Sequence, residues 1–294
     1  MARPNGEAIL FELLRSFTTL AETLNLTRTV EQLGTTRQTV RRHMSILEEH
    51  MGGPLFELNE REYRLTTLGR SALREAQELL ARGEAWLANQ SSHVGGLFHL
   101  KSRQVPQVTY YLQQHPLRQV WTADAPLLQE SIRSWALAGG ALEHPAFQRI
   151  RPFAMVFRLH GESWLCTEVG PKSSFATWFG WEWQRSMIGR ELTDLPGGTS
   201  FATLLAQPMR DVYETEGIRL DHVFTEITRV DGEAPEPVAY RRLLLGCRFP
   251  DGSFALVSIV DRTYNVVIDG VDQTEIERMS PDLLMSPDPN DVID

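Results

Sequence analysis

Four polar side chains with strong hydrogen-bonding capacity lie within six consecutive residues: Arg37, Gln38, Arg41 and Arg42. No acidic residue follows them before Glu48. In the major groove of DNA, arginine can donate two hydrogen bonds to guanine, and glutamine can pair with adenine. The types and spacing of these residues are therefore compatible with base recognition. The alternative is an ordinary helix whose arginines are solvated.

Three helical segments would position these side chains. Residues 9–24 carry apolar residues at helical spacing, which predicts an amphipathic first helix. Asn25 can cap a short second helix over Leu26 to Leu33, and Gly34 can end it. Thr36 can cap a third helix that reaches about residue 50, with Val40, Met44 and Leu47 on its inner face. A short helix, a tight turn and a basic helix in tandem favour DNA binding over a merely solvated surface.

The segment from Asn25 to Leu58, with the following one from Arg61 to Gly69, resembles the DNA-binding domain of LysR-type transcription regulators. The resemblance covers about 70 residues and implies a winged helix-turn-helix that binds double-stranded DNA. The residues that carry it are Asn25-Leu26-Thr27, Thr29-Val30, Leu33, Leu47-Glu48-Glu49, Gly52, Leu55-Phe56-Glu57, Leu65-Thr66 and Gly69.

Three positions depart from the family pattern. Thr29-Val30 replaces paired alanines, Gln38 replaces a proline, and Leu58 stands where an arginine is usual. Leu58 removes one expected contact with the DNA backbone, which Arg61 or Arg64 in the wing could supply. These departures leave the motif recognisable, but no operator sequence can be carried over.

The resemblance also implies roles for individual side chains. It assigns base contacts to Arg37, Gln38 and Arg41, and phosphate contacts to Arg42, Thr27 and Thr36. Arg64 would serve the wing, whereas Phe56 and Leu65 would form the core of the wing.

Residues 67–87 predict a long amphipathic helix with a leucine-rich stripe. Such a stripe can belong to a domain core, but in the LysR-type family this linker helix pairs with its copy in a second subunit. The resemblance therefore implies a homodimer that reads a two-fold site. The sequence leaves the choice between a dimer and a tetramer open.

The bulk composition fits a two-domain globular protein. The chain has 294 residues, a net charge of -9 and 42% hydrophobic residues. No apolar run approaches the roughly 18 residues of a membrane helix, and the N-terminus lacks a secretory signal, so a cytoplasmic protein without membrane contact is expected. Cys166 and Cys247 are too few for a disulfide framework or a metal site.

Beyond the linker helix, residues 91–149 are interpreted as a helical connector. The segment 91–96 is expected to be a hinge, and 127–142 is its clearest helix, ended by Gly139-Gly140. A LysR-type protein normally continues into two α/β lobes of about 200 residues. Too few residues follow this connector, and their pattern differs.

The C-terminal half predicts two strands (153–159 and 164–169), short helices near 173–179 and 186–192, a longer helix over 201–214, and three strands (220–229, 238–249 and 253–261). This order resembles a PAS domain. The similarity is clearest at Trp178 to Leu192 and at Pro250 to Thr263, and it covers roughly residues 150–265. It implies a sensor pocket between the sheet and the helices.

The ligand of such a pocket cannot be named from the sequence. Trp164, Trp178, Trp181 and Trp183 could form an aromatic cage for a planar or cationic ligand, or a hydrophobic core with a partner surface. The cofactor is unknown because neither a flavin nor a haem signature is present. Cys247-Arg248-Phe249 lacks the preceding asparagine of flavin photosensors, and the helix over 201–214 has no axial histidine.

Several further residues have ordinary structural interpretations. His160 and His222 are read as surface or core histidines. In a PAS-type sheet the two cysteines would lie about 14 Å apart, beyond disulfide reach, and both are expected to be buried thiols. Residues 269–294 hold eight acidic residues against one arginine, which predicts a disordered tail.

The sequence thus predicts a multidomain α and α+β protein. Its expected parts are an all-α winged helix-turn-helix (1–66), a linker helix (67–90), a helical connector (91–149), a PAS-like antiparallel sheet with flanking helices (150–268) and the tail (269–294). No catalytic motif stands out, so an enzyme is not expected. The predicted function is ligand- or signal-responsive DNA binding. The alternative is that the PAS-like half is a constitutive protein-interaction module without a small-molecule ligand.

Overall fold

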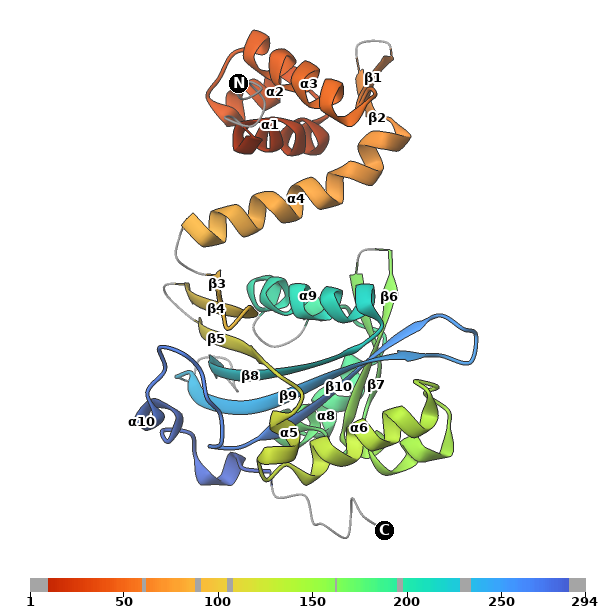
Figure 1. Cartoon of the computed structure of the whole chain (residues 1–294), viewed down its shortest axis with the longest axis vertical. Coiled ribbons are helices and arrows are strands. Elements are labelled where there is room, and N and C mark those ends of the chain that lie inside the picture. Colours follow the sequence, from red (N-terminus) through yellow and green to blue (C-terminus); the bar gives the residue numbers. More distant parts are fainter. Residues whose placement is uncertain are drawn as a thin grey trace. The chain divides into compact units, whose positions relative to one another are not determined.

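A computed structural model describes residues 10–59, 62–87, 91–104, 108–161, 163–194, 198–227 and 234–285. The chain divides between Ser91 and Ser92 into two compact units, and each has its own hydrophobic core. Figure 1 shows helices dominating the first unit and a broad sheet the second.

The N-terminal unit contains three helices, a β-hairpin and a long fourth helix. These elements are α1 (Leu10–Thr23), α2 (Leu26–Leu33), α3 (Arg37–Met51), β1 (Phe56–Asn59), β2 (Glu62–Leu65) and α4 (Thr67–Leu87). The predicted helices are therefore present, with the bounds of α2 and α4 as expected. The core joins the inner sides of α1, α3 and α4 through Phe17, Val40, Met44 and Ala76.

Local capping accounts for the accuracy of these helix ends. The Asn25 side-chain oxygen accepts hydrogen bonds from the backbone N–H groups of Thr27 (2.9 Å) and Arg28 (3.2 Å). Gly34 ends α2 in the left-handed conformation, with φ of 61°. The Thr36 hydroxyl then accepts from the Thr39 N–H and begins α3. Each of these helix ends is therefore specified by residues that lie close to it along the chain.

The C-terminal unit is built on one eight-stranded sheet in the order β3-β4-β5-β8-β9-β10-β6-β7. Neighbouring strands from β4 to β7 in this order pair antiparallel. The strands are β3 (Ser91–Val94), β4 (Leu97–Gln104), β5 (Val108–His115), β6 (Ala154–His160), β7 (Ser163–Val169), β8 (Ile218–Ile227), β9 (Glu236–Arg248) and β10 (Phe254–Arg262). The helices are α5 (Gln119–Thr122), α6 (Pro126–Ala138), α7 (Ser174–Phe179), α8 (Trp181–Met187), α9 (Gly198–Thr215) and α10 (Gln273–Ile276), with short 3-10 turns at 145–149, 151–153, 192–194 and 281–283.

The prediction of a helical connector is wrong for residues 91–115. They form β3, β4 and β5, and the expected hinge at 91–96 is instead strand β3 and its turn at Gly95-Gly96. β5 pairs with β8, more than 100 residues later in the chain. β5 also pairs with β4, the strand directly before it in the chain, and its residues from Val108 to Leu112 are good strand formers, so the prediction of a helical connector overlooked a local signal as well as a distant partner. The helix expected over 127–142 is present as α6, and Gly139 caps it.

Helices cover both faces of this sheet because side chains alternate along each strand. On β9, Leu243 and Leu245 pack in the cluster that includes α5 and α6, whereas Leu244 belongs to the cluster that includes α9. Figure 1 shows α6 and α9 on opposite sides of the sheet. We call the face of Leu244 the α9 face, and the face of Leu243 the α6 face.

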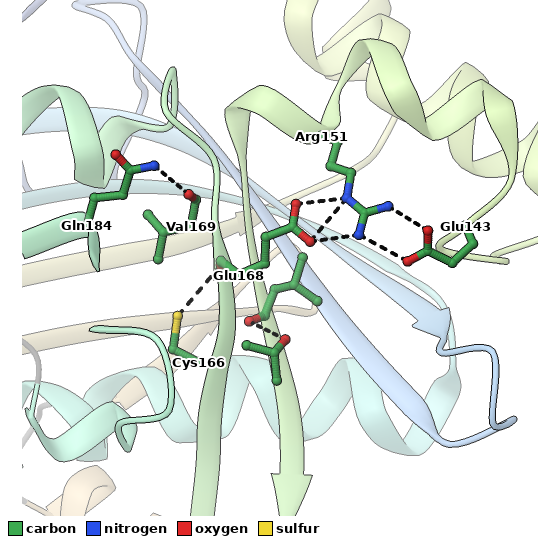
Figure 2. A network of polar contacts seen from close by, with 8 residues as sticks. Glu143, Arg151, Cys166, Glu168, Val169 and Gln184 are labelled. Carbon is green, nitrogen blue, oxygen red and sulfur yellow. Dashed lines mark hydrogen bonds and ion pairs between the residues drawn. The ribbon is translucent and has the colours of Figure 1, made fainter. Parts of the chain in front are cut away.

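Two polar contacts hold the edge strand β7. The Arg151 guanidinium lies between two carboxylates, bonding Glu168 on β7 (2.8 Å) and Glu143 (2.9 Å), as Figure 2 shows. Gln184 on α8 donates to the Val169 carbonyl (2.8 Å). The second short helix therefore lies over 181–187, not over 186–192 as predicted, and it is docked on β7.

The expected disordered tail is also wrong for residues 269–285; residues 286–294 lie outside the described ranges. Ile276, Met279 and Leu283 are buried in the core of the C-terminal unit. The buried Arg262 on β10 donates to the Leu283 carbonyl, to Ser174 (3.0 Å) and to Thr177 (3.0 Å). Apolar residues spaced among many acidic ones thus anchor a segment whose average composition predicts disorder.

Three histidines of the sheet form hydrogen bonds with the backbone of Val267 and Asp269, at the beginning of the C-terminal segment. His222 on β8 accepts a hydrogen bond at Nδ1 from the Val267 N–H (3.0 Å), and His115 on β5 bonds the Val267 carbonyl (2.8 Å). The rings of His115 and His222 lie 4.0 Å apart. His99 on β4 bonds the Asp269 carbonyl (3.2 Å). We call residues 263–285 the C-terminal strap.

Candidate functional site

The basic helix α3 presents its predicted residues to solvent. Arg37, Gln38, Arg41 and Arg42 are all exposed, whereas Val40, His43, Met44 and Leu47 on the other side are buried. The two sets separate because the helical repeat places residues 40, 44 and 47 on one face. The structure therefore leaves the basic face uncovered by the N-terminal unit itself.

Arg37 is connected to the second helix. Its Nη2 donates to the hydroxyl of Thr27 (2.8 Å), and both side chains are exposed. The sequence analysis placed these residues in different roles, one on bases and one on phosphate. The structure places them in direct contact through Nη2 alone, so the other donors of the Arg37 guanidinium are not used by Thr27.

Arg28 is an exposed residue that the sequence analysis did not select. It lies in the first turn of α2, beside the Asn25 cap. A helix N-terminus attracts anions, and an adjacent guanidinium adds to this attraction. Its position three residues after the predicted cap, in the first turn of the helix, is the signal that could have identified it.

A buried hydrogen bond holds α3 against α1. The Ser16 hydroxyl and Nδ1 of His43 are 2.7 Å apart, and both residues are almost fully buried. Burial lowers the pKa of His43, and the neighbouring Arg42 lowers it further. The imidazole is therefore neutral near pH 7 and serves to position the basic helix.

The wing is joined to α3 and α4 by close backbone contacts. Glu48 accepts from the Leu55 N–H (2.8 Å), and the Thr66 hydroxyl donates to the Pro54 carbonyl (2.7 Å). A Cβ atom at Gly69 would lie 2.1 Å from the Leu55 carbonyl oxygen. Glycine is thus required at the position where the family pattern has it.

The wing hairpin presents Leu58 and Arg64 to solvent, and Leu58 is 64% exposed. Arg64 is therefore placed where it can act as predicted, while Arg61 lies outside the described residues. Phe56 packs edge-on against Phe17 (5.7 Å between ring centroids) and Tyr63, in agreement with the predicted wing core.

The long helix α4 packs on α1 with part of its apolar surface. Gly83 lies against the ring of Phe11, where an added Cβ would approach to 2.9 Å. Leu79, Trp86 and Leu87 remain 49%, 69% and 67% exposed. Three large apolar side chains on one helix of a small unit form a surface suited to a partner.

The four tryptophans proposed as an aromatic cage are divided between two environments. Trp164 is buried and packs edge-on against Tyr213 and Phe254, whereas Trp178 stacks on Phe179. Trp181 is 65% exposed and Trp183 is 37% exposed. This arrangement agrees with the alternative of a core plus an exposed surface, and it contradicts a single cage of all four.

The cysteines and histidines of the sheet have structural positions. Cys166 on β7 and Cys247 on β9 are free and buried, with β10 and β6 between their strands, as predicted. Burial raises the pKa of each thiol to about 12. His160 is exposed and His222 is buried against His115.

Charged residues inside the C-terminal unit were missed by the sequence analysis. Arg219 and Asp221 on β8 and Arg242 on β9 are each 3% exposed or less. The signal was available, because Arg241-Arg242 interrupts a strand that is otherwise apolar. Charged residues are seldom fully buried unless they are paired or functional.

No helix in the ranges given above is both long and apolar enough to cross a membrane. Within those same ranges, no three His, Cys, Asp or Glu side chains are grouped as metal ligands would be.

Known proteins are similar to the N-terminal part of this chain. Residues 11–70 match the model of the bacterial regulatory helix-turn-helix protein, lysR family. The HTH-type transcriptional regulator IlvR of Caulobacter vibrioides is 39% identical over 71 residues, which is 24% of each protein. The first unit therefore contains a LysR-type helix-turn-helix domain.

Solved structures with similarity include full-length OxyR from Pseudomonas aeruginosa, 30% identical over 27% of this chain and 28% of that one, with a TM-score of 0.25. The DNA-bound DNA-binding domain of CbnR is 26% identical over 27% of this chain and 91% of that one, with a TM-score of 0.26. The chain spans about a quarter of the length of the full-length relatives that it matches.

Proposed function

We propose that this protein is a transcription regulator that binds specific duplex DNA through α3 and the wing. The observation that carries the proposal is the exposed face of α3, with three arginines and a glutamine next to capped helix ends, in a unit that matches the LysR-type model. Arg37, Gln38 and Arg41 contact bases, while Arg42, Thr27, Thr36 and Arg64 contact the backbone.

The protein acts as a homodimer that pairs through α4. The exposed Leu79, Trp86 and Leu87 support this assignment, since pairing would remove them from water. A dimer related by a two-fold axis would read a two-fold operator.

The C-terminal unit is a PAS-like sensor that modulates DNA binding in response to a small molecule. Two strands, a helical segment and three further strands follow one another along residues 154–262, and all five strands are neighbours in one sheet. This order supports the PAS-like interpretation. β3, β4 and β5 extend the sheet beyond β8 and are an addition to that pattern.

One observation favours the alternative of a protein-interaction module. Trp181 and Ile188, at either end of α8, are 65% and 53% exposed. An exposed apolar surface of this kind suits a protein partner. Replacing both with serine should abolish partner capture if this surface binds a protein, and should leave a response to small molecules unchanged.

Genome-wide affinity selection of sheared DNA by the full-length protein tests the main proposal. An Arg37→Ala/Arg41→Ala variant is the control. Each arginine contributes about 1–3 kcal/mol of base discrimination, so the variant should lose the motif while retaining weak general binding. Enrichment of the same motif by both proteins would refute the base-contact assignment. Enrichment of no motif by the wild type would refute sequence-specific binding by the isolated protein.

A further inference from the structure

The α9 face of the sheet holds a cluster of charged residues that the helix-turn-helix does not use. Asp221 on β8 lies directly opposite Arg242 on β9, and Arg219 is two residues before Asp221 on the same face. Their exposed fractions are 0%, 3% and 3%. Three ionisable groups are thus removed from water in the middle of a core.

The hydrogen bonds in this cluster leave it short of buried negative charge. Asp221 accepts from Arg219 Nε at one oxygen (2.7 Å) and from Arg242 Nη2 at the other (2.9 Å). Arg219 Nη1 also donates to Asp211 on α9, whose side chain is 34% exposed. Two fully buried guanidinium groups therefore share one fully buried carboxylate, and the second carboxylate lies at the boundary with solvent.

Donors in the cluster remain without acceptors. Among the described residues, nothing accepts a hydrogen bond from Arg219 Nη2 or Arg242 Nε, although both atoms are buried. An unpaired donor in a core loses its hydration without compensation, and the loss is greatest for a charged group. Apolar residues would stabilise such a core better than a partly satisfied ionic cluster does. The cluster therefore has hydrogen-bonding capacity that a further acceptor could use.

The surroundings combine phenols with apolar side chains. Tyr110 on β5 and Tyr240 on β9 are buried on this face, and their hydroxyl groups interact with each other and with Arg242. Burial raises the pKa of both tyrosines, so they stay neutral. Val223 lies between Leu112 and Tyr240 in the strand register, and the Phe98 ring faces Arg219 at 5.4 Å. A molecule bound here would meet both cationic donors and apolar surface.

Arg241 precedes Arg242 on β9 and lies on the α6 face, where its ionic environment differs from that of the cluster. Arg241 bonds Asp261 (2.6 Å) and the Asp124 carbonyl (2.7 Å), and both ionic partners are buried. Two of its nitrogens also lack acceptors. However, one guanidinium here faces one buried carboxylate, so the charge is balanced. The Arg241–Asp261 pair is therefore a matched control for the cluster on the α9 face.

We propose that Arg219 and Arg242 bind the carboxylate group of a small organic acid whose apolar part packs between the sheet and α9. Arginine presents its donors in the planar geometry that a carboxylate needs. The added carboxylate would compete with Asp211 for Arg219, which couples occupancy of the site to the position of α9. The proposal rests on the sensor role given above and names the class of its ligand.

Thermal unfolding of the full-length protein in the presence of hexanoate or 3-phenylpropionate tests this site. The corresponding neutral amides and inorganic phosphate are measured at the same ionic strength. At ten times its dissociation constant, a bound acid should raise the Tm of the C-terminal unit by about 3–6 °C. The amides, which lack the charge, and phosphate, which lacks the apolar part, should leave the Tm unchanged.

Removing a single buried charge could unfold the unit, so the decisive variant removes the whole cluster: Arg219→Met, Asp221→Leu and Arg242→Met. It should fold with an equal or higher Tm and give no shift with the acids. The control Arg241→Met with Asp261→Leu should retain the shift. Equal shifts with acids and amides, a shift that survives the triple substitution, or no shift with either acid would overturn the proposal.

The DNA selection experiment separates this inference from the proposed function. If the wild-type protein enriches a motif but no acid changes its Tm, only the carboxylate site is wrong. If an acid binds but no DNA motif is enriched, the site stands and the regulatory role fails.

Discussion

The two units of this protein use arginine in opposite ways. In the N-terminal unit, Arg37, Arg41 and Arg42 lie on an exposed helix face, and the core beneath them is a cluster of apolar side chains. In the C-terminal unit, Arg219 and Arg242 lie inside the core, around a single buried aspartate. The exposed arginines of the first unit remain hydrated, whereas the cluster in the second unit has buried donors that no described residue accepts.

This difference distinguishes two kinds of recognition. Exposed arginines keep their hydration until a polyanion displaces it, so they suit a large ligand whose affinity depends on salt. Buried arginines have already lost their hydration, so they suit a small ligand that fits within the core. Stability should therefore respond strongly to the buried arginines and weakly to the exposed ones.

The largest effect is expected from Asp221→Leu. Removing this carboxylate leaves the buried Arg242 without its ionic partner and leaves the buried Arg219 with the half-exposed Asp211 alone. Loss of one member of a buried ionic group destabilises a protein by about 3–5 kcal/mol. Urea unfolding followed by tryptophan fluorescence measures this, since six of the seven tryptophans lie in the second unit. A loss below about 1 kcal/mol would mean that the cluster does not sustain the fold.

Gly69→Ala tests the packing of the wing. The new methyl group would meet the Leu55 carbonyl oxygen at 2.1 Å, so the turn between the wing and α4 must shift. Forced overpacking of this kind costs about 1–3 kcal/mol. Hydrogen exchange of the N-terminal unit should show faster exchange at α4 and the wing, with Gly53→Ala, where the approach is 3.3 Å to a side chain, as the milder comparison. Equal effects of the two substitutions would contradict this account.

Acid should weaken the C-terminal strap. Burial, His115 and Arg241 lower the pKa of His222 from 6.5 to about 3. Between these values the unfolded chain binds a proton that the folded chain excludes, so stability falls as the pH decreases below about 6.5. The expected slope for His222 is about 1.4 kcal/mol per pH unit.

His222→Asn is the matched variant, because an asparagine oxygen can also accept a hydrogen bond from Val267. Urea unfolding at pH 7, 6 and 5 should show a shallower pH dependence for this variant than for the wild type. Burial also lowers the pKa of His99 and His115, so a residual slope of the same sign is expected. Parallel curves for the two proteins would exclude His222 as a contributor.

The smallest effect on stability is expected from Arg42→Ala. The side chain is exposed, and such substitutions change the unfolding free energy by less than about 0.5 kcal/mol. Its removal should instead reduce the slope of log affinity against log salt by about one, since one phosphate contact is lost. Binding isotherms at several salt concentrations measure this slope. A loss of stability without a change in slope would contradict the contrast between the exposed arginines and the buried cluster.

The accuracy of the sequence analysis differs between the two units for a physical reason. The ends of α2 and the start of α3 follow from Asn25, Gly34 and Thr36, whose contacts reach only two to four residues along the chain. The sequence likewise predicted all five strands of residues 154–262 to within about three residues, because most of them are apolar runs next to turns. Strand β5 was missed although its first partner β4 is adjacent in the chain, because polar residues follow its strand-forming start; its second partner β8 is supplied by a distant segment.

The candidate sites show the same limit. Exposure of the four polar residues on α3 follows from their helical spacing, so the sequence could select them together. The contact between Arg37 and Thr27 required the turn between two helices, and the division of the four tryptophans required the packing of α7 and α8. The acidic composition of the strap wrongly predicted disorder. Burial of Ile276, Met279 and Leu283 depends on contacts with the rest of the C-terminal unit, which average composition does not describe.

The sequence by itself determined the helix-turn-helix, its basic face and the strand order of the second half, because short-range capping, periodicity and turns specify these features. Only the tertiary structure decided that Arg219, Asp221 and Arg242 meet inside the core. Their meeting depends on the register between β8 and β9 and on the docking of α9. Neighbouring strands place residues 20 or more positions apart side by side, and no local preference of the chain encodes which charges they bury together.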